Sequence, residues 1–158
     1  MKVAQKKPVV TSDCYTVVLF TEAKVEKPEP QVPETYKQYL GEWGGGAWNG
    51  VWCHDLLVTK VYPDGRADVF EMHAPYEPWL QPATAFRRTA RFDGEGNLRF
   101  AYGTETASYR IVDGKLQATR AGQHGNLKAT LVRRGMPPVP QPRPTRLVQA
   151  SASAVPGT

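Results

Sequence analysis

The side chains best suited to chemistry in this chain are Lys60, Glu71 and His73, which flank a predicted β-hairpin. The turn is Tyr62-Pro-Asp-Gly-Arg66, and Asp-Gly between two β-rich runs is a strong hairpin signal. A two-residue turn at Asp64-Gly65 pairs Leu56 with His73, Val58 with Glu71 and Lys60 with Val69. Side chains alternate along a strand, so one face carries a mixed set: Leu56, Val58, Lys60, Tyr62, Ala67, Val69, Glu71 and His73. The opposite face is mostly apolar: Leu57, Thr59, Val61, Asp68, Phe70 and Met72.

The chemistry of this hairpin depends on which face points into the protein. If the mixed face is inside, Lys60, Glu71 and His73 form a polar constellation in an apolar cup, as a ligand or proton-transfer site needs. If the apolar face is inside, the interior is a dry plug and Glu71 and His73 are solvated. We expect the dry plug, because burying an unpaired charge is costly.

The segment that follows, Ala74-Pro-Tyr-Glu-Pro-Trp-Leu-Gln-Pro82, is stiff and aromatic. Its Tyr76 and Trp79 are candidate ligand-binding residues at the rim or lid of a binding site. The same residue types are enriched at protein–protein contacts, so the loop is also a candidate contact surface. The remaining alternative is that Trp79 simply covers an open end of the fold.

Other chemistry is sparse. His54, His73 and His124 lack the spacing of a zinc site, and the chain contains no nucleophile elbow, phosphate loop or dinucleotide fingerprint. We therefore expect no metal and no cofactor. Cys14 and Cys53 allow one disulfide. We expect two reduced thiols instead, because no secretory signal is visible.

The pattern of turns predicts an all-β fold. Further turn signals lie at residues 92–98, 112–115 and 121–125, and no segment keeps helical periodicity over three turns. Short strands at this regular spacing are typical of a meander that closes into a barrel or folds as a sandwich. The run Tyr39–Trp52 holds three tryptophans among five glycines. It is predicted to be a sharply bent opening strand with large rings that plug one end.

An ordered series of motifs resembles bacterial lipocalin-like barrel domains, which are short up-and-down barrels mostly without assigned function. The matching motifs are Gly41-Glu-Trp43, Trp48-Asn-Gly50, Leu56-Leu-Val58, Asp64-Gly65, Trp79 and Phe86-Arg-Arg88. The resemblance covers residues 39–134 and implies one antiparallel barrel of about eight strands. It also implies a plug formed by Trp43 and Trp48, with Trp43 capped by Arg133 or Arg134. The body is shorter than a full lipocalin, which argues against a large ligand cavity.

Composition divides the chain into three parts. Residues 1–35 are predicted to be an arm with one strand and a proline-containing linker, residues 36–134 the barrel, and residues 135–158 an extended Pro/Ser/Ala-rich tail. The net charge of +5 is spread along the chain. The most basic run, Phe86–Arg91, is predicted to be a strand with a solvated basic face, so we expect no nucleic-acid partner. We see no membrane span and no signal peptide, which predicts a cytoplasmic location.

Three functions remain open. The expected one is a non-catalytic accessory or interaction protein, whose termini (residues 1–35 and 135–158) bind a larger protein assembly. The first alternative is a lipocalin-type binder of a small apolar ligand beneath the loop that holds Tyr76 and Trp79. The second is a small barrel isomerase or cyclase that uses Glu71 and His73. Catalysis is the less expected outcome.

Overall fold

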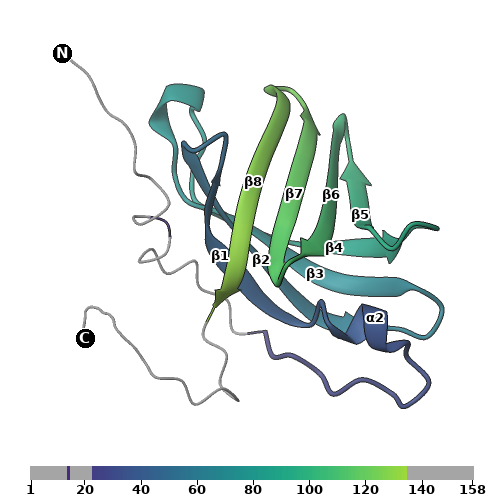
Figure 1. The fold of residues 1–158 in the computed structure, drawn as a ribbon. Coiled ribbons are helices and arrows are strands. Elements are labelled where there is room, and N and C mark those ends of the chain that lie inside the picture. Colours follow the sequence, from purple (N-terminus) through teal and green to yellow (C-terminus); the bar gives the residue numbers. More distant parts are fainter. Residues whose placement is uncertain (1–13, 15–22, 135–158) are drawn as a thin grey trace, which may run out of the picture.

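Eight antiparallel strands form a closed barrel in the computed structural model, which describes residue 14 and residues 23–134 (Figure 1). Each strand pairs with the next, and β8 pairs with β1 to close the barrel. The strands are β1 (Gly41–Trp48), β2 (Trp52–Val61), β3 (Arg66–His73), β4 (Thr84–Phe92), β5 (Leu98–Tyr102), β6 (Glu105–Val112), β7 (Lys115–Gly122) and β8 (Gly125–Arg134). Two short helical turns accompany them: α2 (Glu34–Lys37) and η2 (Glu77–Trp79). The predicted all-β up-and-down barrel of eight strands is confirmed.

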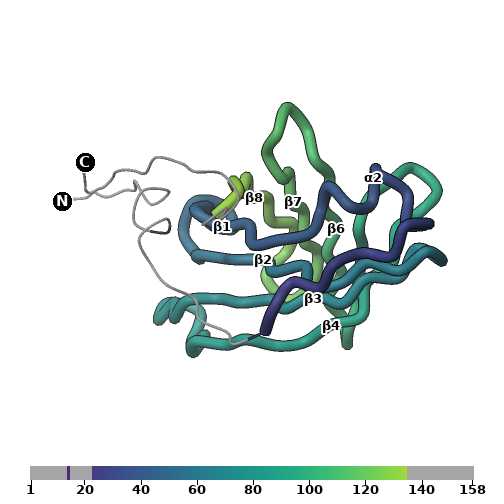
Figure 2. Tube along the Cα trace, turned by 90° about the horizontal axis from the view of Figure 1, so that it is seen from below, coloured from purple at the N-terminus to yellow at the C-terminus, as the bar shows by residue number. Residues whose placement is uncertain are grey.

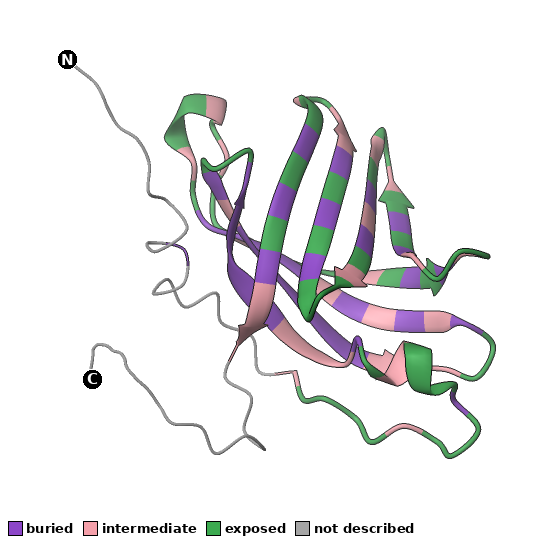
Figure 3. Cartoon of the chain, viewed as in Figure 1, coloured by how far each residue is buried: buried purple, intermediate pink, exposed green. Residues whose placement is uncertain are grey.

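Strict alternation builds the wall formed by β6, β7 and β8. Along β7, for example, Leu116, Ala118 and Arg120 are buried while the residues between them are exposed, and Figure 3 shows the resulting stripes. The opposite wall differs, because β2 is buried over most of its length on both faces. Among the described residues, no helix is long and apolar enough to cross a membrane.

The glycines of β1 let other groups approach its backbone closely. A Cβ atom at Gly46 would lie 2.1 Å from the carbonyl oxygen of Thr130 on β8, and one at Gly44 would collide with the Asp55 carboxylate. The pairing of β1 with β2 is also irregular between Trp43 and Gly46. Larger side chains at Gly44 and Gly46 would therefore prevent β1 from pairing with both neighbours.

The hairpin register predicted from the sequence is wrong by two residues. The turn is longer than two residues, since the Tyr62 amide donates to the Arg66 carbonyl (2.9 Å). Leu56 then pairs with Glu71, and a register shift between Val58 and Lys60 follows. This irregularity turns Lys60 outward, where its ammonium group lies 3.3 Å from the Glu26 carboxylate.

The expected dry plug is also wrong, because the mixed face of the hairpin points inward. Leu56, Val69, Glu71 and His73 are all buried. The cost that argued against this arrangement applies to an unpaired charge, and Glu71 is paired. Its partners come from β4 and β7, far away in the sequence, so the hairpin alone could not reveal them.

The segment before β1 belongs to the barrel. The Glu26 amide donates to the Thr59 carbonyl on β2 (2.7 Å), where the purple segment runs in Figure 2. Val32 is buried in the core, and the Tyr36 ring stacks on Phe92 with centroids 4.0 Å apart. The packed unit therefore starts before the boundary expected at residue 36. The single strand expected between Val9 and Lys24, like the tail at 135–158, lies almost wholly outside the described residues.

The two cysteines form a disulfide, so the expectation of reduced thiols is wrong. The Cα atoms of Cys14 and Cys53 are 5.3 Å apart, which is a separation that a disulfide bridges without backbone movement. The Cys14 carbonyl also accepts a hydrogen bond from Arg134 (2.6 Å). Closing a loop of this length contributes roughly 4 kcal/mol in the chain-entropy account. Sequence spacing gives no information on such a distance.

Candidate functional site

The two ends of the barrel differ in chemistry. One end, here called the closed end, is packed with apolar and aromatic side chains: Tyr39, Trp43, Val61, Phe92, Leu98, Leu116 and Leu131. The other, here called the polar end, contains buried charges and lies beside the β1–β2, β3–β4, β5–β6 and β7–β8 connections. Its charged and hydroxyl side chains are Glu71, Arg88, Tyr102, Glu105 and Arg120.

Glu71 lies at the centre of the polar end and is only 1% exposed. Arg88 Nε donates to its Oε1 (3.1 Å), and Arg120 Nη1 donates to its Oε2. Arg120 also donates to Glu105 Oε1 (3.0 Å) and to the Tyr102 hydroxyl. Two carboxylates and two guanidinium groups thus balance each other, as buried charges require.

Strand geometry brings these groups together from five strands, β3 to β7. On β3 and β4, Glu71 faces Phe86 and Arg88 faces Val69, so Glu71 and Arg88 are diagonal neighbours on the inner face. Arg120 follows the buried Leu116 and Ala118 on β7 and takes the next inward position. Glu105 begins β6 and Tyr102 ends β5, at the same end of the barrel.

Burial and the Glu71 carboxylate together set the electrostatics of this end. Burial by itself would lower the pKa of Arg120, but the Glu71 carboxylate raises it, so the guanidinium stays charged. Burial and the same carboxylate raise the pKa of Tyr102 and Tyr109. Both phenols therefore stay protonated, and the Tyr109 hydroxyl can donate to His54 Nε2.

A stack of four rings, here called the aromatic column, adjoins this network. Its ring centroids are 4.9 Å apart between Trp48 and His54, 4.6 Å between His54 and His73, and 4.0 Å between His73 and Trp52. The Trp48 indole N–H donates to His73 Nε2 (2.9 Å). The column thus holds two histidines between two tryptophans.

Both histidines of the column are neutral. His54 Nδ1 lies 2.9 Å from the Met72 carbonyl oxygen and Nε2 lies 2.8 Å from the Tyr109 hydroxyl. Since the carbonyl can only accept, Nδ1 carries the proton and Nε2 accepts from Tyr109. Burial lowers the pKa of His54 to about 4 and lowers that of His73 well below its usual value.

The β3–β4 loop adds further aromatic rings between the aromatic column and the surface. Trp79 stacks on His124 of the β7–β8 turn (4.2 Å) and meets Trp52 edge-on (5.8 Å). Tyr76 contacts Trp79 edge-on (5.0 Å). Leu80 has a positive φ of 55° and is 86% exposed. The loop therefore covers part of the polar end and leaves an apolar side chain at its rim.

The wall of the barrel is least continuous between β4 and β5. These strands pair only through Arg91 with Arg99 and Phe92 with Leu98, and then diverge (Figure 1). Phe86 is 49% exposed although its register faces inward. The Arg88 guanidinium bridges the divergence, with its Cζ atom 3.5 Å from the centroid of the Tyr102 ring.

Four of the five predicted ligand-site residues meet at the polar end: Glu71, His73, Tyr76 and Trp79. Lys60 does not, because it points outward to Glu26. Sequence reasoning missed Arg88 and Arg120. Strand alternation puts Arg88 on the same face as Phe86 and Phe92, and Leu116-x-Ala118-x-Arg120 carries the same signal. Both patterns could have indicated inward-facing cations.

The predicted plug is found only in part. The Arg133 guanidinium lies 4.1 Å from the Trp43 ring centroid, which is the expected cation–π contact, and Arg133 Nη1 donates to the Leu40 carbonyl (2.7 Å). Trp48 instead belongs to the aromatic column at the other end of the barrel. Arg134 instead donates to Asp55 Oδ2 (2.7 Å). One arginine therefore caps the tryptophan while the next binds a carboxylate.

Comparison of the chain with protein-family models, with curated proteins and with solved structures found no match. Within residues 23–134 and Cys14, no group of three or more His, Cys, Asp or Glu side chains is placed to hold a metal ion. The geometry of the polar end is therefore the basis on which a function can be inferred.

Proposed function

We propose that this barrel is a non-catalytic binding protein that takes a small, flat and mostly apolar molecule at its polar end. The observation that carries this proposal is the partial exposure of three aromatic rings at the polar end. Phe86 and Tyr102 lie on β4 and β5, where these strands diverge, and Trp79 lies at the rim beside His124. Aromatic rings offer flat surfaces for stacking, and ligand sites combine such surfaces with a few fixed polar groups.

The charges of the polar end favour an uncharged ligand. Glu71 and Glu105 are balanced by Arg88 and Arg120, so a charged ligand would leave one charge without compensation. Tyr102 and His124 are partly exposed residues at this end. The hydroxyl of the first and the imidazole of the second would supply the polar contacts that orient the ligand.

The hydrogen bonds of Glu71 and His73 favour ligand binding over proton transfer as the role of this end. Both carboxylate oxygens of Glu71 accept hydrogen bonds from guanidinium groups, and His73 Nε2 accepts one from Trp48. A general base needs an acceptor atom directed at the substrate. An isomerase or cyclase that uses Glu71 and His73 would first have to break these bonds.

Titration with N-phenyl-1-naphthylamine, a neutral flat fluorophore, tests this proposal. We expect saturable binding that weakens at least fivefold in Trp79→Ala and Phe86→Ala, while the melting temperatures of both variants stay within a few degrees of the parent protein. Val112→Ala is the matched control, because Val112 is also an exposed apolar residue (40%) but lies at the opposite end of the barrel. Equal affinity in all four proteins, or no saturable binding, would contradict the proposal.

A second candidate is docking onto a larger protein assembly through the termini. It is favoured by the composition of residues 135–158, which contain six prolines and lack the apolar residues for a core of their own. Deletion of residues 135–158 should leave the melting transition intact and abolish a stoichiometric partner seen by native mass spectrometry. A truncated chain that no longer folds would make the tail part of the fold instead.

A further inference from the structure

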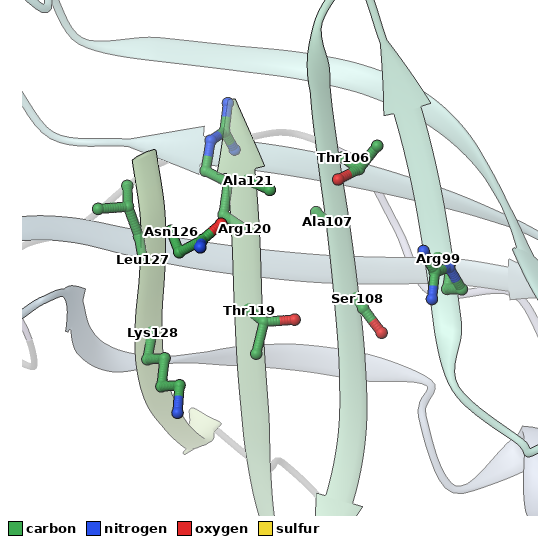
Figure 4. Close-up of a pocket in the computed structure, with 10 residues that line it drawn as sticks. All are labelled: Arg99, Thr106, Ala107, Ser108, Thr119, Arg120, Ala121, Asn126, Leu127 and Lys128. Atoms are coloured by element: carbon green, nitrogen blue, oxygen red, sulfur yellow. The ribbon is translucent and has the colours of Figure 1, made fainter. Parts of the chain in front are cut away.

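A second site lies on the outer surface of the barrel. A pocket of about 410 Å³ covers the outer face of β5 to β8 (Figure 4). Its outward-facing side chains are cationic, hydroxyl or amide groups: Arg99, Thr106, Ser108, Thr119, Asn126 and Lys128. None of the described residues that line it is acidic or aromatic. Its chemistry is therefore different from that of the polar end.

Strand register places four of these side chains in one row across the sheet. Arg99 pairs with Ser108, Ser108 with Thr119, and Thr119 with Lys128. Adjacent strands are about 4.8 Å apart, so the row has a cation at each end, about 14 Å apart along the sheet, and two hydroxyls between them. Long arginine and lysine side chains can lean inward from both ends toward one anion placed over the hydroxyls.

These groups are free to bind. Within residues 23–134, the side chains of Ser108, Thr119 and Lys128 make no hydrogen bond or ion pair. Arg99 has only a long contact of 3.9 Å to Asp93, and its side chain is 52% exposed. Arg91 also pairs directly with Arg99 on the adjacent strand, and like charges in register are unfavourable unless something screens them.

We propose that this pocket binds a phosphate or sulfate monoester carried on a sugar-sized polyol. Arg99 and Lys128 hold the anionic group, and Ser108 and Thr119 donate hydroxyl hydrogen bonds to its oxygens. Thr106 and Asn126, at the edge of the pocket, bind the hydroxyls of the polyol. Because no ring lines the pocket, nucleobase stacking has no platform.

Calorimetric titration of the full chain at low ionic strength tests the site with four probes: inorganic phosphate, glucose 6-phosphate, glucose 6-sulfate and glucose. We expect both glucose esters to bind more tightly than inorganic phosphate, and glucose not to bind. Binding of one ester alone would identify whether phosphate or sulfate is the natural group.

Variants separate this site from general cationic attraction. Arg99→Gln and Lys128→Gln should each weaken binding of the esters at least tenfold. Lys115→Gln is the matched control, because Lys115 is an exposed cation on β7 that lies outside the pocket, and its affinity should change less than twofold. Equal losses in all three variants, or no binding of any anionic probe, would overturn the proposal. Exposed side chains are substituted throughout, so unchanged melting temperatures will confirm that the variants are folded.

Discussion

The two ends of this barrel are built by the same strand alternation but are stabilised differently. At the closed end, aromatic and apolar packing fills the interior: Tyr39 packs edge-on against Phe92 (5.1 Å), and Arg133 lies over Trp43. At the polar end, Glu71 is tolerated only because arginines arrive from β4 and β7. Apolar packing accepts many arrangements, whereas a buried ion network requires particular partners. Packing at the closed end therefore stabilises the fold, while the ion network at the polar end selects which side chains can lie together there.

Trp43→Ala tests the closed end. We expect a loss of about 3–5 kcal/mol in the free energy of unfolding, because a fully buried ring is removed and its cavity cannot collapse completely. Urea denaturation followed by far-UV circular dichroism measures it. A loss below 1 kcal/mol would mean that Trp43 does not hold this end together.

Arg120→Met tests the polar end. We expect a loss of about 3–5 kcal/mol, because the buried Glu71 and the partly buried Glu105 lose a shared partner. The double variant Glu71→Leu/Arg120→Met removes one charge of each sign and should be more stable than the single variant. A double variant that is less stable than Arg120→Met would show that charge balance is not what the network provides.

Acid should weaken the polar end selectively. The pKa of His54 is lowered by burial to about 4. As the pH falls, His54 is therefore protonated in the unfolded chain at a higher pH than in the folded protein. The stability contribution of His54 is complete above about pH 6.5 and is lost as the pH falls toward 4, by about 3 kcal/mol. His73 acts in the same direction.

Asp55 changes the stability in the opposite direction as the pH falls, so a variant without its carboxyl group is needed to see the effect of the histidines. Burial and the neighbouring Glu42 raise the pKa of Asp55 to about 8, against the lowering effect of Arg134. Its contribution is therefore present at low pH and is lost as the pH rises toward 8. We expect Asp55→Asn to lose stability between pH 6.5 and 4 more steeply than the parent protein. Parallel pH profiles for the two proteins would contradict these assignments.

Lys60→Gln should have the smallest effect. Lys60 contacts Glu26 on the surface and lies over the Tyr62 ring (4.9 Å), and exposed ion pairs contribute little. We expect a change below about 0.5 kcal/mol in stability and unchanged affinity for N-phenyl-1-naphthylamine. A strong loss of either would mean that Lys60 points inward, as the mixed face read from the sequence required.

Much of the fold was predictable because turns and alternation are local signals. Asp64-Gly65 marked the hairpin correctly, but a turn signal does not fix the turn's length, and one register shift was enough to turn Lys60 outward. The inward face was misjudged for a related reason. The cost of burying Glu71 was assessed without Arg88 and Arg120, which only closure of the barrel brings near. The disulfide was judged from the absence of a visible secretory signal, while the 5.3 Å separation of the two Cα atoms that allows it is set by the fold.

An NMR titration of ¹⁵N-labelled protein with N-phenyl-1-naphthylamine distinguishes the two ends most directly. If the polar end binds a ligand and the closed end does not, the amides of Trp79, Phe86, Tyr102 and His124 should shift, together with the side-chain indole N–H of Trp52. We expect no shift at Trp43, Leu98 or Leu116. Shifts centred on the closed end, or no shifts at saturating probe, would contradict this expectation.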